Sequence, residues 1–212
     1  MSNRIHCLIS AGPTREWIDR VRYISNPSSG KMGFALANAA VESGMEVTLV
    51  TGPVAIPPPK GLIVINVETA IEMNEVMLQH FKSASLIIMS AAVCDHRPAL
   101  SHETKIKKED FCSTLELEKN PDILMNLGKI KMPTQTLVGF AAETDNHVTN
   151  AVIKLEQKNL DWVALNDVSK KDSGFQSDKN SLTMISRNDE KVVLKHQSKI
   201  SLARKVIDLV LP

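Results

Sequence analysis

The residues best suited to chemistry lie near the start of the chain, in a segment of small, polar and basic side chains. Residues 25–33 read Ser-Asn-Pro-Ser-Ser-Gly-Lys-Met-Gly, between an apolar run at 4–9 and a helical pattern at 31–43. Backbone N–H groups in such a loop point at a ligand, and the dipole of the following helix favours negative charge there. The whole connection, residues 10–33, is unusually long, and long connections in compact domains tend to be functional. The segment predicts an anion site, with a plain structural loop as the alternative.

This segment differs from two well-known phosphate-binding loops. A G-x-G-x-x-G run is absent from the turn, and Lys31 is followed by Met32 where a P-loop has Ser or Thr. Gly30 and Gly33 would still let the backbone come close to a phosphate. We therefore expect an anion to be held by backbone N–H groups and hydroxyls.

Charged residues further along the chain could serve a nucleotide. Lys105, Lys107 and Lys108 place three ammonium groups within four residues, which suits a triphosphate. Spacing alone favours the other interpretation, a charged run in solvent. Asp95 follows an apolar run at 86–90, where it can hold a ribose, a base edge or a metal, or cap a turn.

Three further segments have both a functional and a structural interpretation. Residues 120–124 predict a helix start, for which a plain cap is the better explanation. Phe140, at the end of a predicted buried strand, is either a ring for a base or sugar or a core residue, and residues 166–169 are equally ambiguous. Cys94 is more typical of a small buried side chain than of a nucleophile. The six histidines show no metal-ligand spacing.

The elements that must position these residues alternate between strand and helix. Strands are predicted at 4–9, 46–50, 62–67, 86–90, 137–140 and 162–165, and helices at 31–43, 69–81, 122–129, 148–158 and 199–211. Residues 115–119 alternate like a half-exposed strand, and residues 181–196 predict a β-hairpin. This predicts an α/β fold in a single domain over 1–212: a Rossmann-like three-layer αβα sandwich with a mostly parallel sheet, a β extension and a C-terminal hairpin and helix. Ligands of such sheets bind at the carboxyl ends of the strands, where the segments above lie.

Composition excludes several classes of protein. The net charge of +1 argues against an electrostatic nucleic-acid binder, and no apolar run reaches membrane-spanning length. The three cysteines are widely spaced, without a C-x-x-C pair, and no signal peptide pattern precedes the first strand. We expect a reduced, cytoplasmic protein with neither nucleic-acid nor membrane partners.

Taken together, eight segments resemble phosphopantothenoylcysteine synthetase, the phosphopantothenate–cysteine ligase of coenzyme A biosynthesis. They occur in the family's order and cover nearly the whole chain: residues 12–16, 22–26, 28–34, 91–95, 105–108, 120–123, 139–144 and 166–169. The resemblance implies that the carboxylate of 4′-phosphopantothenate attacks the α-phosphate of CTP and releases pyrophosphate. The amine of L-cysteine then attacks the acyl-cytidylate, which gives 4′-phosphopantothenoylcysteine and CMP.

The resemblance also implies roles for individual residues. Lys105 matches the catalytic lysine, which contacts the phosphates, and Asn26 matches an essential asparagine. Because an amide is no general base at neutral pH, we interpret Asn26 as a hydrogen-bonding group that orients the acyl-cytidylate. Other matched positions form an anion site at Gly12, Ser29 and Gly30, and a nucleotide site at Ala91, Asp95, Pro121, Asp122, Ile123, Leu124, Phe140, Lys154 and Lys158.

The remaining implications concern cofactors and partners. Mg²⁺ is expected with CTP, although no metal ligand is assigned, and the choice between CTP and ATP stays open. A homodimer is expected, with residues 105–119 near the interface. Because the sequence begins at the synthetase strand, we expect a separate phosphopantothenoylcysteine decarboxylase to use the product. Departures from common family residues at Ser10, Ala11, Pro27, Cys94 and His96 leave Asn26 and Lys105 in place.

Two other functions compete with this interpretation. A nucleotide-cofactor oxidoreductase would need a glycine fingerprint after the first strand and an acidic residue after the second, and both are missing. A non-catalytic nucleotide-binding module would be expected to lack Asn26 or Lys105, and both are present.

Overall fold

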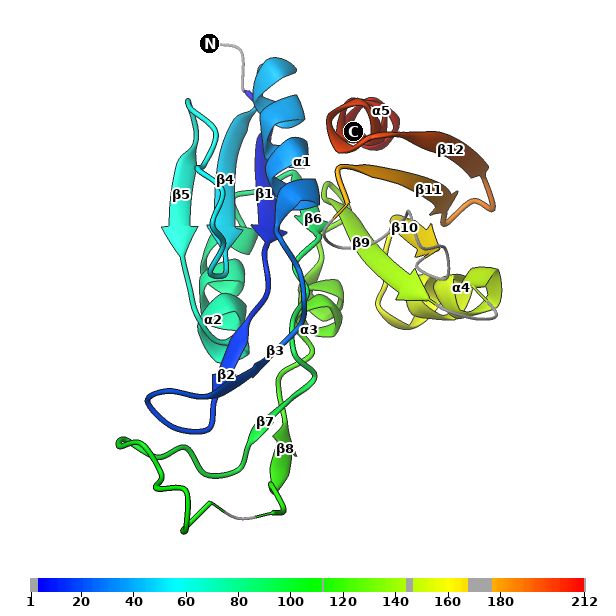
Figure 1. Ribbon diagram of the computed structural model, residues 1–212. Helices are drawn as coiled ribbons and strands as arrows, with labels where there is room; N and C mark the ends of the chain where they lie inside the picture. Colours follow the sequence, from blue (N-terminus) through cyan, green and yellow to red (C-terminus); the bar gives the residue numbers. More distant parts are fainter. Residues whose placement is uncertain (1–3, 112, 144–146, 168–176, 212) are drawn as a thin grey trace.

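One large sheet forms the centre of the molecule (Figure 1). The computed structural model describes residues 4–111, 113–143, 147–167 and 177–211. The strand order is β12-β11-β10-β9-β6-β1-β4-β5, and the six strands from β10 to β5 are parallel, while β11 and β12 run antiparallel. The strands are β1 (His6–Ala11), β4 (Glu46–Thr51), β5 (Ile63–Asn66), β6 (Leu86–Met89), β9 (Thr136–Glu143), β10 (Trp162–Asp167), β11 (Lys179–Ser186) and β12 (Lys191–Ser198).

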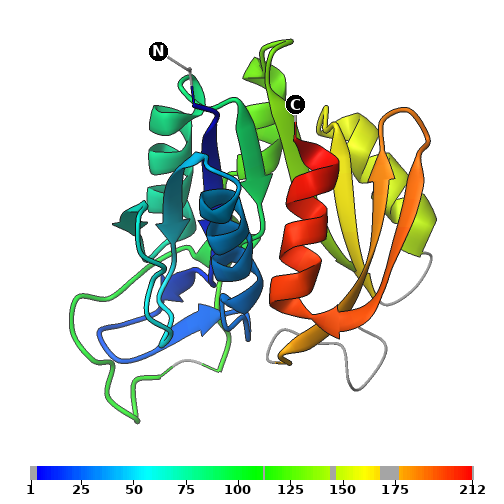
Figure 2. The same cartoon turned by 90° about the horizontal axis from the view of Figure 1, so that it is seen from above.

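Helices cover both faces of this sheet (Figure 2). Helices α1 (Lys31–Glu42) and α5 (Lys199–Val210) pack on one face and on each other. On the other face lie α2 (Ala70–Phe81), α3 (Ile123–Ile130) and α4 (His147–Gln157). All four residues of β6 are buried, because a central strand covered on both sides must be apolar throughout. The predicted three-layer α/β sandwich with a C-terminal hairpin and helix is confirmed.

Side chains at the helix starts explain where most of the described helices begin. The Thr69 hydroxyl accepts a hydrogen bond from the backbone N–H of Glu72, and the Asp122 carboxylate accepts one from that of Met125. Helix α1 differs, because its N-cap Gly30 has a φ of 74° and offers no side-chain cap. The contact at this start comes from the preceding loop, where the Ser28 hydroxyl accepts a hydrogen bond from the Gly30 N–H at 3.3 Å.

A glycine also brings α1 close to the sheet. A Cβ at Gly33 would lie 2.4 Å from the Cβ of Ala11 and 2.7 Å from the hydroxyl oxygen of Ser90. Any larger residue would push the helix start away from the ends of β1 and β6. The glycine thus fixes the N–H groups of α1 next to the strand ends.

Several boundaries differ from the sequence-based prediction. Strand β1 runs two residues further, to Ala11, and β9 continues past Phe140 to Glu143. The long connection after β1 holds a small hairpin of β2 (Arg15–Trp17) and β3 (Tyr23–Ser25). Strand β8 (Leu117–Lys119) pairs with an unpredicted β7 (His96–Pro98), and all three β8 residues are exposed. The alternation at 115–119 indicates β8, whereas β2, β3 and β7 are too short for a detectable periodicity.

Successive strands are added first on one side of β1 and then on the other. The chain moves from β1 through β4 to β5 at one edge and then crosses over to β6 on the other side of β1. The carboxyl ends of β1 and β6 therefore flank the switch point at which open α/β sheets bind ligands. Within the described ranges, no helix has the length and apolar character needed to cross a membrane.

Candidate active site

Two cavities lie side by side at the carboxyl edge of the sheet. The helix-end cavity, of about 220 Å³, is lined by Asn26, Ser28, Gly30, Lys31, Met32, Gly33, Ser90, Ala91, Ala92, Val93, Phe140, Ala141, Asn166, Asn180 and Lys199. The α3–α4 cavity, of about 170 Å³, is lined by Met89, Ala91, Val93, Cys94, Asp95, Asn120, Pro121, Asp122, Ile123, Leu124, Phe140, Lys154 and Lys158. Ala91, Val93 and Phe140 line both. A ligand in one cavity is thus separated from a ligand in the other by a single wall.

Asn26 is fixed in the helix-end cavity by its own amide group. Its Nδ2 donates to the backbone carbonyls of Ala92, at 3.1 Å, and Val93, at 3.2 Å. The β2–β3 hairpin that carries Asn26 is anchored to the same segment, because the Thr14 hydroxyl accepts a hydrogen bond from the Cys94 backbone N–H. With Nδ2 engaged, Oδ1 is the atom that can accept a hydrogen bond from a ligand. The orienting role of Asn26 stays a prediction, in which Oδ1 is the atom that would meet the substrate.

Cys94 has the character of a packed thiol. Burial raises the pKa of the Cys94 thiol, and the nearby carboxylates of Glu16 and Asp95 add to the rise. A thiol with a raised pKa is largely protonated at neutral pH and is a poor nucleophile. This agrees with the interpretation of Cys94 as a small buried residue.

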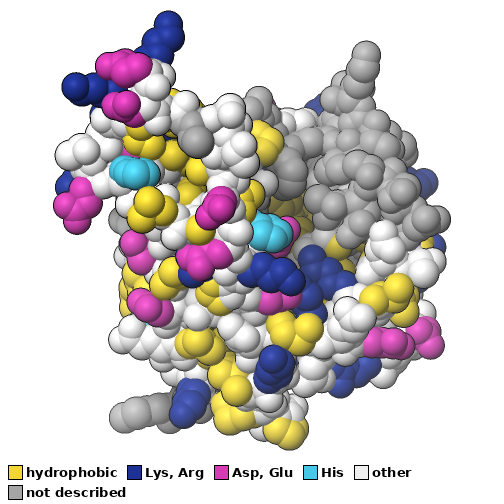
Figure 3. All heavy atoms as spheres, turned by 90° about the horizontal axis from the view of Figure 1, so that it is seen from below, with side chains coloured by type: hydrophobic (Ala, Val, Ile, Leu, Met, Phe, Trp, Pro, Cys, Tyr) yellow, Lys and Arg dark blue, Asp and Glu magenta, His cyan; other side chains and the backbone are white. Residues whose placement is uncertain are grey.

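Positive groups surround the helix-end cavity. Lys31, at the start of α1, forms an ion pair of 2.5 Å with Asp178, and Lys199, at the start of α5, is only 6% exposed. Burial and the charge of Lys31 lower the pKa of Lys199. An anion in the cavity would favour the protonated form of Lys199. The face presented by this edge of the sheet has Lys and Arg side chains gathered near its centre (Figure 3).

One buried polar atom also points to a ligand in this cavity. Asn166 is 8% exposed, and its Oδ1 has no hydrogen-bond partner within the described part of the chain. A buried acceptor without a donor is costly, so a ligand with an N–H or O–H group would stabilise it. The cavity thus suits a molecule that combines an anionic end with a hydrogen-bond donor.

The α3–α4 cavity contains all the residues that the sequence assigned to the nucleotide except Lys105. These residues come from four separate segments: Ala91, Asp95, Pro121, Asp122, Ile123, Leu124, Phe140, Lys154 and Lys158. The Lys154 ammonium donates to the Phe140 carbonyl at 2.7 Å, and Lys158 pairs with Asp122 at 2.8 Å. Burial alone would raise the pKa of the Asp122 carboxyl, but Lys158 and the Met125 N–H outweigh burial and lower it. The i, i+4 lysine pair therefore faces one cavity, as predicted.

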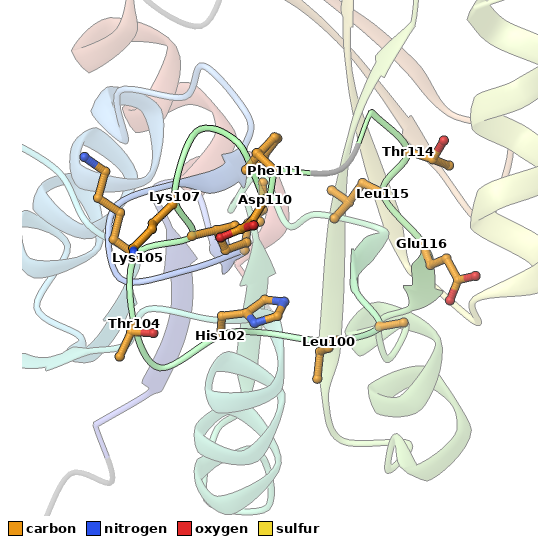
Figure 4. A pocket seen from close by; sticks show the side chains of 13 residues that line it. Leu100, His102, Thr104, Lys105, Lys107, Asp110, Phe111, Thr114, Leu115 and Glu116 are labelled. Carbon is orange, nitrogen blue, oxygen red and sulfur yellow. The ribbon is translucent and has the colours of Figure 1, made fainter.

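The structure does not bring all predicted residues together. Gly12 and Ser29 line neither cavity, although Gly12 packs close to Gly30: a Cβ on Gly30 would lie 3.5 Å from the Gly12 Cα. Lys105 lines a third cavity of about 570 Å³, between Ile18 and the loop that carries Lys105 (Figure 4). Lys105 lies there outside a β-strand. Asn26 and Lys105 thus occupy different cavities.

Three residues of the helix-end cavity were missed by the sequence analysis. Asn166 belongs to a segment that was noted but left ambiguous, and its last two residues, 168 and 169, lie outside the described residues. Asn180 and Lys199 reach the cavity only because β11 and β12 bring the start of α5 next to the start of α1. Their spacing in the sequence contains no sign of this contact.

The donor set of the α3–α4 cavity fits a magnesium ion carried by a nucleotide. Asp95 and Asp122 are its carboxylates, and the described residues contain no group of three or more His, Cys, Asp or Glu side chains that could form a cage. Mg²⁺ is usually held by one or two carboxylates together with substrate phosphates and waters.

Comparison with known proteins assigns the chain to a family. The family model described as "DNA/pantothenate metabolism flavoprotein C-terminal domain" matches residues 2–212. The chain belongs to this family. The resemblance found in the sequence is thereby confirmed at the level of the family.

Curated relatives of this DNA/pantothenate metabolism flavoprotein domain are longer than the chain. The "Coenzyme A biosynthesis bifunctional protein CoaBC" of Vibrio cholerae is 45% identical over 205 residues, which cover 96% of this chain and 51% of the relative. A "Cysteine/Cysteine sulfinic acid decarboxylase" from an unknown prokaryotic organism is 44% identical over 207 residues, which cover 95% of this chain and 58% of the relative. The chain therefore spans about half the length of the curated relatives it matches.

A solved structure of this flavoprotein domain supports the fold. The crystal structure of the C-terminal domain of CoaBC aligns with a TM-score of 0.83 and 39% identity, covering 97% of this chain and 93% of that one. The arrangement of strands and helices described above is thus the family's arrangement.

Proposed function

We propose that this chain is a phosphopantothenate–cysteine ligase that works through an acyl-cytidylate. The observation that carries the proposal is the pair of cavities that share Ala91, Val93 and Phe140. The reaction needs an anionic acyl substrate and a nucleotide to meet at one bond, and adjoining cavities with a thin wall suit that requirement.

We assign the helix-end cavity to 4′-phosphopantothenate. Its phosphate suits the backbone N–H groups at the start of α1 and the Lys199 ammonium, while its amide and hydroxyl groups suit the unpaired Oδ1 of Asn166. Gly12 and Ser29 remain predicted parts of this anion site through their place beside Gly30. Asn26 lines this cavity and is bonded to the carbonyl of Val93, a residue of the wall shared with the α3–α4 cavity, where the acyl group would approach the nucleotide.

We assign the α3–α4 cavity to CTP. Its lysines face the phosphates, and Phe140 offers a ring to the sugar or base. Asp95 would hold the Mg²⁺ that accompanies the triphosphate, because Asp122, the other carboxylate of the cavity, is paired with Lys158. The ion would neutralise charge on the phosphate oxygens. The preference for CTP over ATP rests on the resemblance to bacterial synthetases.

In the proposed reaction, a carboxylate oxygen attacks the α-phosphorus and the bond to pyrophosphate breaks. The cysteine amine then attacks the acyl carbon, loses a proton and displaces CMP. Negative charge is concentrated on the phosphate oxygens in both steps. Lys154, Lys158 and Lys105 would stabilise this charge electrostatically. Asn26 Oδ1 holds a substrate N–H so that the acyl carbon faces the amine.

A steady-state assay tests this proposal. Release of CMP and pyrophosphate should require 4′-phosphopantothenate, L-cysteine and nucleotide together, with CTP and ATP compared side by side. An oxidoreductase would release neither product, and a binding module would hold nucleotide without turnover.

Replacing Lys158 by Met should weaken nucleotide binding about tenfold, because one phosphate-facing charge is lost and Asp122 is left without its partner. Isothermal titration with CTP measures the change. Lys195→Met is the matched control, since Lys195 is exposed on β12 away from the cavity. Equal CTP affinities for the two variants would contradict the assignment of this cavity.

We also propose a homodimer formed around the segments next to β7 and β8. These segments expose four large apolar side chains: Leu100, Phe111, Leu115 and Leu117, of which Leu100 is 66% exposed. Exposed apolar side chains gathered in one region mark interaction surfaces. The position of Lys105 in this same region would link dimer formation to the active site.

Replacing Leu117 by Lys should shift the protein from dimer toward monomer, because a charge would be placed in the apolar contact. Sedimentation velocity over a range of concentrations measures the shift. Val193→Lys, at an exposed apolar residue on β12, should remain dimeric. A wild-type protein that sediments as a monomer at micromolar concentration would overturn the proposal.

The reaction also implies a place in a sequence of reactions. The proposed product retains the carboxylate of cysteine, and we propose that a phosphopantothenoylcysteine decarboxylase removes it in the next step.

A further inference from the structure

A buried carboxylate lies between β2 and β3, outside both cavities of the candidate active site. Asp19 is 1% exposed. Its Oδ1 accepts hydrogen bonds from the backbone N–H groups of Val21 and Arg22, each at 2.8 Å. Its Oδ2 accepts from the Arg22 guanidinium and from the backbone N–H of Ile106, each at 3.2 Å. Three of these donors belong to its own turn, and the fourth comes from a distant part of the chain.

The fourth donor is informative because of the peptide group to which it belongs. The N–H of Ile106 is part of the peptide bond that joins Lys105 to Ile106. The carbonyl of Ile106 is held as well, since it accepts from the Arg22 guanidinium at 3.3 Å. The backbone just after Lys105 is therefore fixed on both sides by one acid and one base.

Further contacts join the same two parts of the molecule. We call residues 101–111 the Lys105 segment. The His102 backbone N–H donates to the Ile18 carbonyl at 3.0 Å, and Arg20 donates to the Glu103 carbonyl at 3.0 Å. The Arg22 guanidinium also lies 4.3 Å from the ring centroid of Phe111. Asp19 lies at the centre of these contacts, because it orients Arg22 and also bonds to the segment itself.

The charge of Asp19 is well suited to this position. Burial alone would raise the pKa of the Asp19 carboxyl, but the three backbone N–H groups and Arg22 outweigh burial and lower it. The carboxylate is thus ionised at neutral pH, and a buried ionised group is retained only where its partners are in place.

We propose that Asp19 is a positioning residue that sets the location of Lys105 by holding the Lys105–Ile106 peptide. This inference rests on the proposed catalytic role of Lys105. The β2–β3 turn that carries Asp19 leads directly into Asn26, so one short hairpin would set the position of both proposed catalytic residues.

Asp19→Asn separates this role from a purely local one. The amide oxygen of Asn can replace Oδ1 toward the backbone N–H groups of Val21 and Arg22. Its NH₂ group would face the Ile106 N–H and the Arg22 guanidinium, which are both donors. We expect the rate of pyrophosphate release to fall about 10-fold to 100-fold, as is typical for misplacement of a catalytic group. Affinity for CTP should stay within about twofold, because Asp19 lies outside the α3–α4 cavity. Asp208→Asn, the same change at an exposed residue of α5, should leave the rate unchanged.

A double-mutant cycle with Lys105→Gln decides how Asp19 acts. If Asp19 acts through Lys105, adding Asp19→Asn to the Lys105→Gln enzyme should change the rate by less than about twofold. If the rate loss of the double variant equalled the product of the two single losses, Asp19 would act independently of Lys105, and the inference would be overturned. If Lys105→Gln alone left the rate unchanged, the proposed role of Lys105 would fail instead, which is a different outcome.

Amide hydrogen exchange of the unsubstituted protein gives a second test that needs no variant to fold. The Ile106 amide hydrogen should exchange at least about tenfold more slowly than it would in an unstructured peptide, because its hydrogen bond goes to a buried carboxylate. Exchange at the rate of an unstructured peptide would contradict the contact and, with it, the inference.

Discussion

Replacing Asn26 by Asp should lower turnover about 100-fold to 1,000-fold, a loss typical of removing a preorganised donor or acceptor from an active site. The affinity for CTP should stay within about twofold of the wild-type value. The Nδ2 group that donates to the carbonyls of Ala92 and Val93 would become an oxygen facing two oxygens. The side chain would turn away, and its remaining oxygen would no longer meet the substrate N–H. The nucleotide cavity does not include Asn26, so binding of CTP should persist.

The position of Asn26 also predicts which step is affected. In the proposed reaction, attack on the α-phosphorus takes place in the adjoining cavity, whereas transfer to cysteine depends on the orientation of the acyl group. Single-turnover quenching of the Asn26→Asp enzyme should therefore show pyrophosphate release and accumulation of the acyl-cytidylate. Asn38→Asp is the matched control, because Asn38 lies exposed on α1. Normal turnover by Asn26→Asp would refute the orienting role.

Replacing Lys105 by Gln should slow pyrophosphate release about 100-fold, because the charge that we propose stabilises the transferring phosphates would be lost. In the structure Lys105 lines its own cavity and its backbone is held by Asp19 and Arg22, so we propose that Lys105 serves the nucleotide bound to the second chain of the dimer. Rapid-quench measurement of the first turnover separates this step from later ones. CTP affinity should change little, since the α3–α4 cavity has its own two lysines.

The neighbouring lysines provide the control for this prediction. Lys108→Gln removes the same charge three residues away, and its rate should stay within about twofold of wild type if position rather than local charge matters. Equal losses in the two variants would favour the charged-run interpretation that spacing alone suggested for residues 105–108. An unchanged rate in Lys105→Gln would remove Lys105 from the mechanism.

Much of the α3–α4 cavity, the proposed nucleotide site, could be predicted because its positions follow from rules local to the sheet. Asp95 follows β6, Asp122 caps α3 and Phe140 lies in β9, and the carboxyl ends of parallel neighbours must meet. The pair Lys154 and Lys158 shares a helix face because of its spacing. For these residues, an element and its order in the sheet are enough to place the side chain.

The rest depends on contacts between segments that are far apart in sequence. Lys199 reaches the helix-end cavity only through the β11–β12 hairpin, and Ile106 reaches Asp19 across 87 residues. The three-residue strands β2, β3 and β7 that frame these contacts have too few residues for a periodic pattern. Long-range pairing of this kind is fixed by tertiary packing, which no local propensity reports.

The origin of one oxygen atom in CMP tests the central claim most directly. If the carboxylate of 4′-phosphopantothenate attacks the α-phosphorus of CTP, substrate labelled with ¹⁸O in both carboxylate oxygens must pass one label to CMP and keep the other in the new amide. Mass spectrometry of the products after a single turnover with L-cysteine reads both positions. We predict CMP with one ¹⁸O and unlabelled pyrophosphate. Unlabelled CMP, or CDP with labelled inorganic phosphate, would contradict the acyl-cytidylate and with it the proposed use of the two cavities.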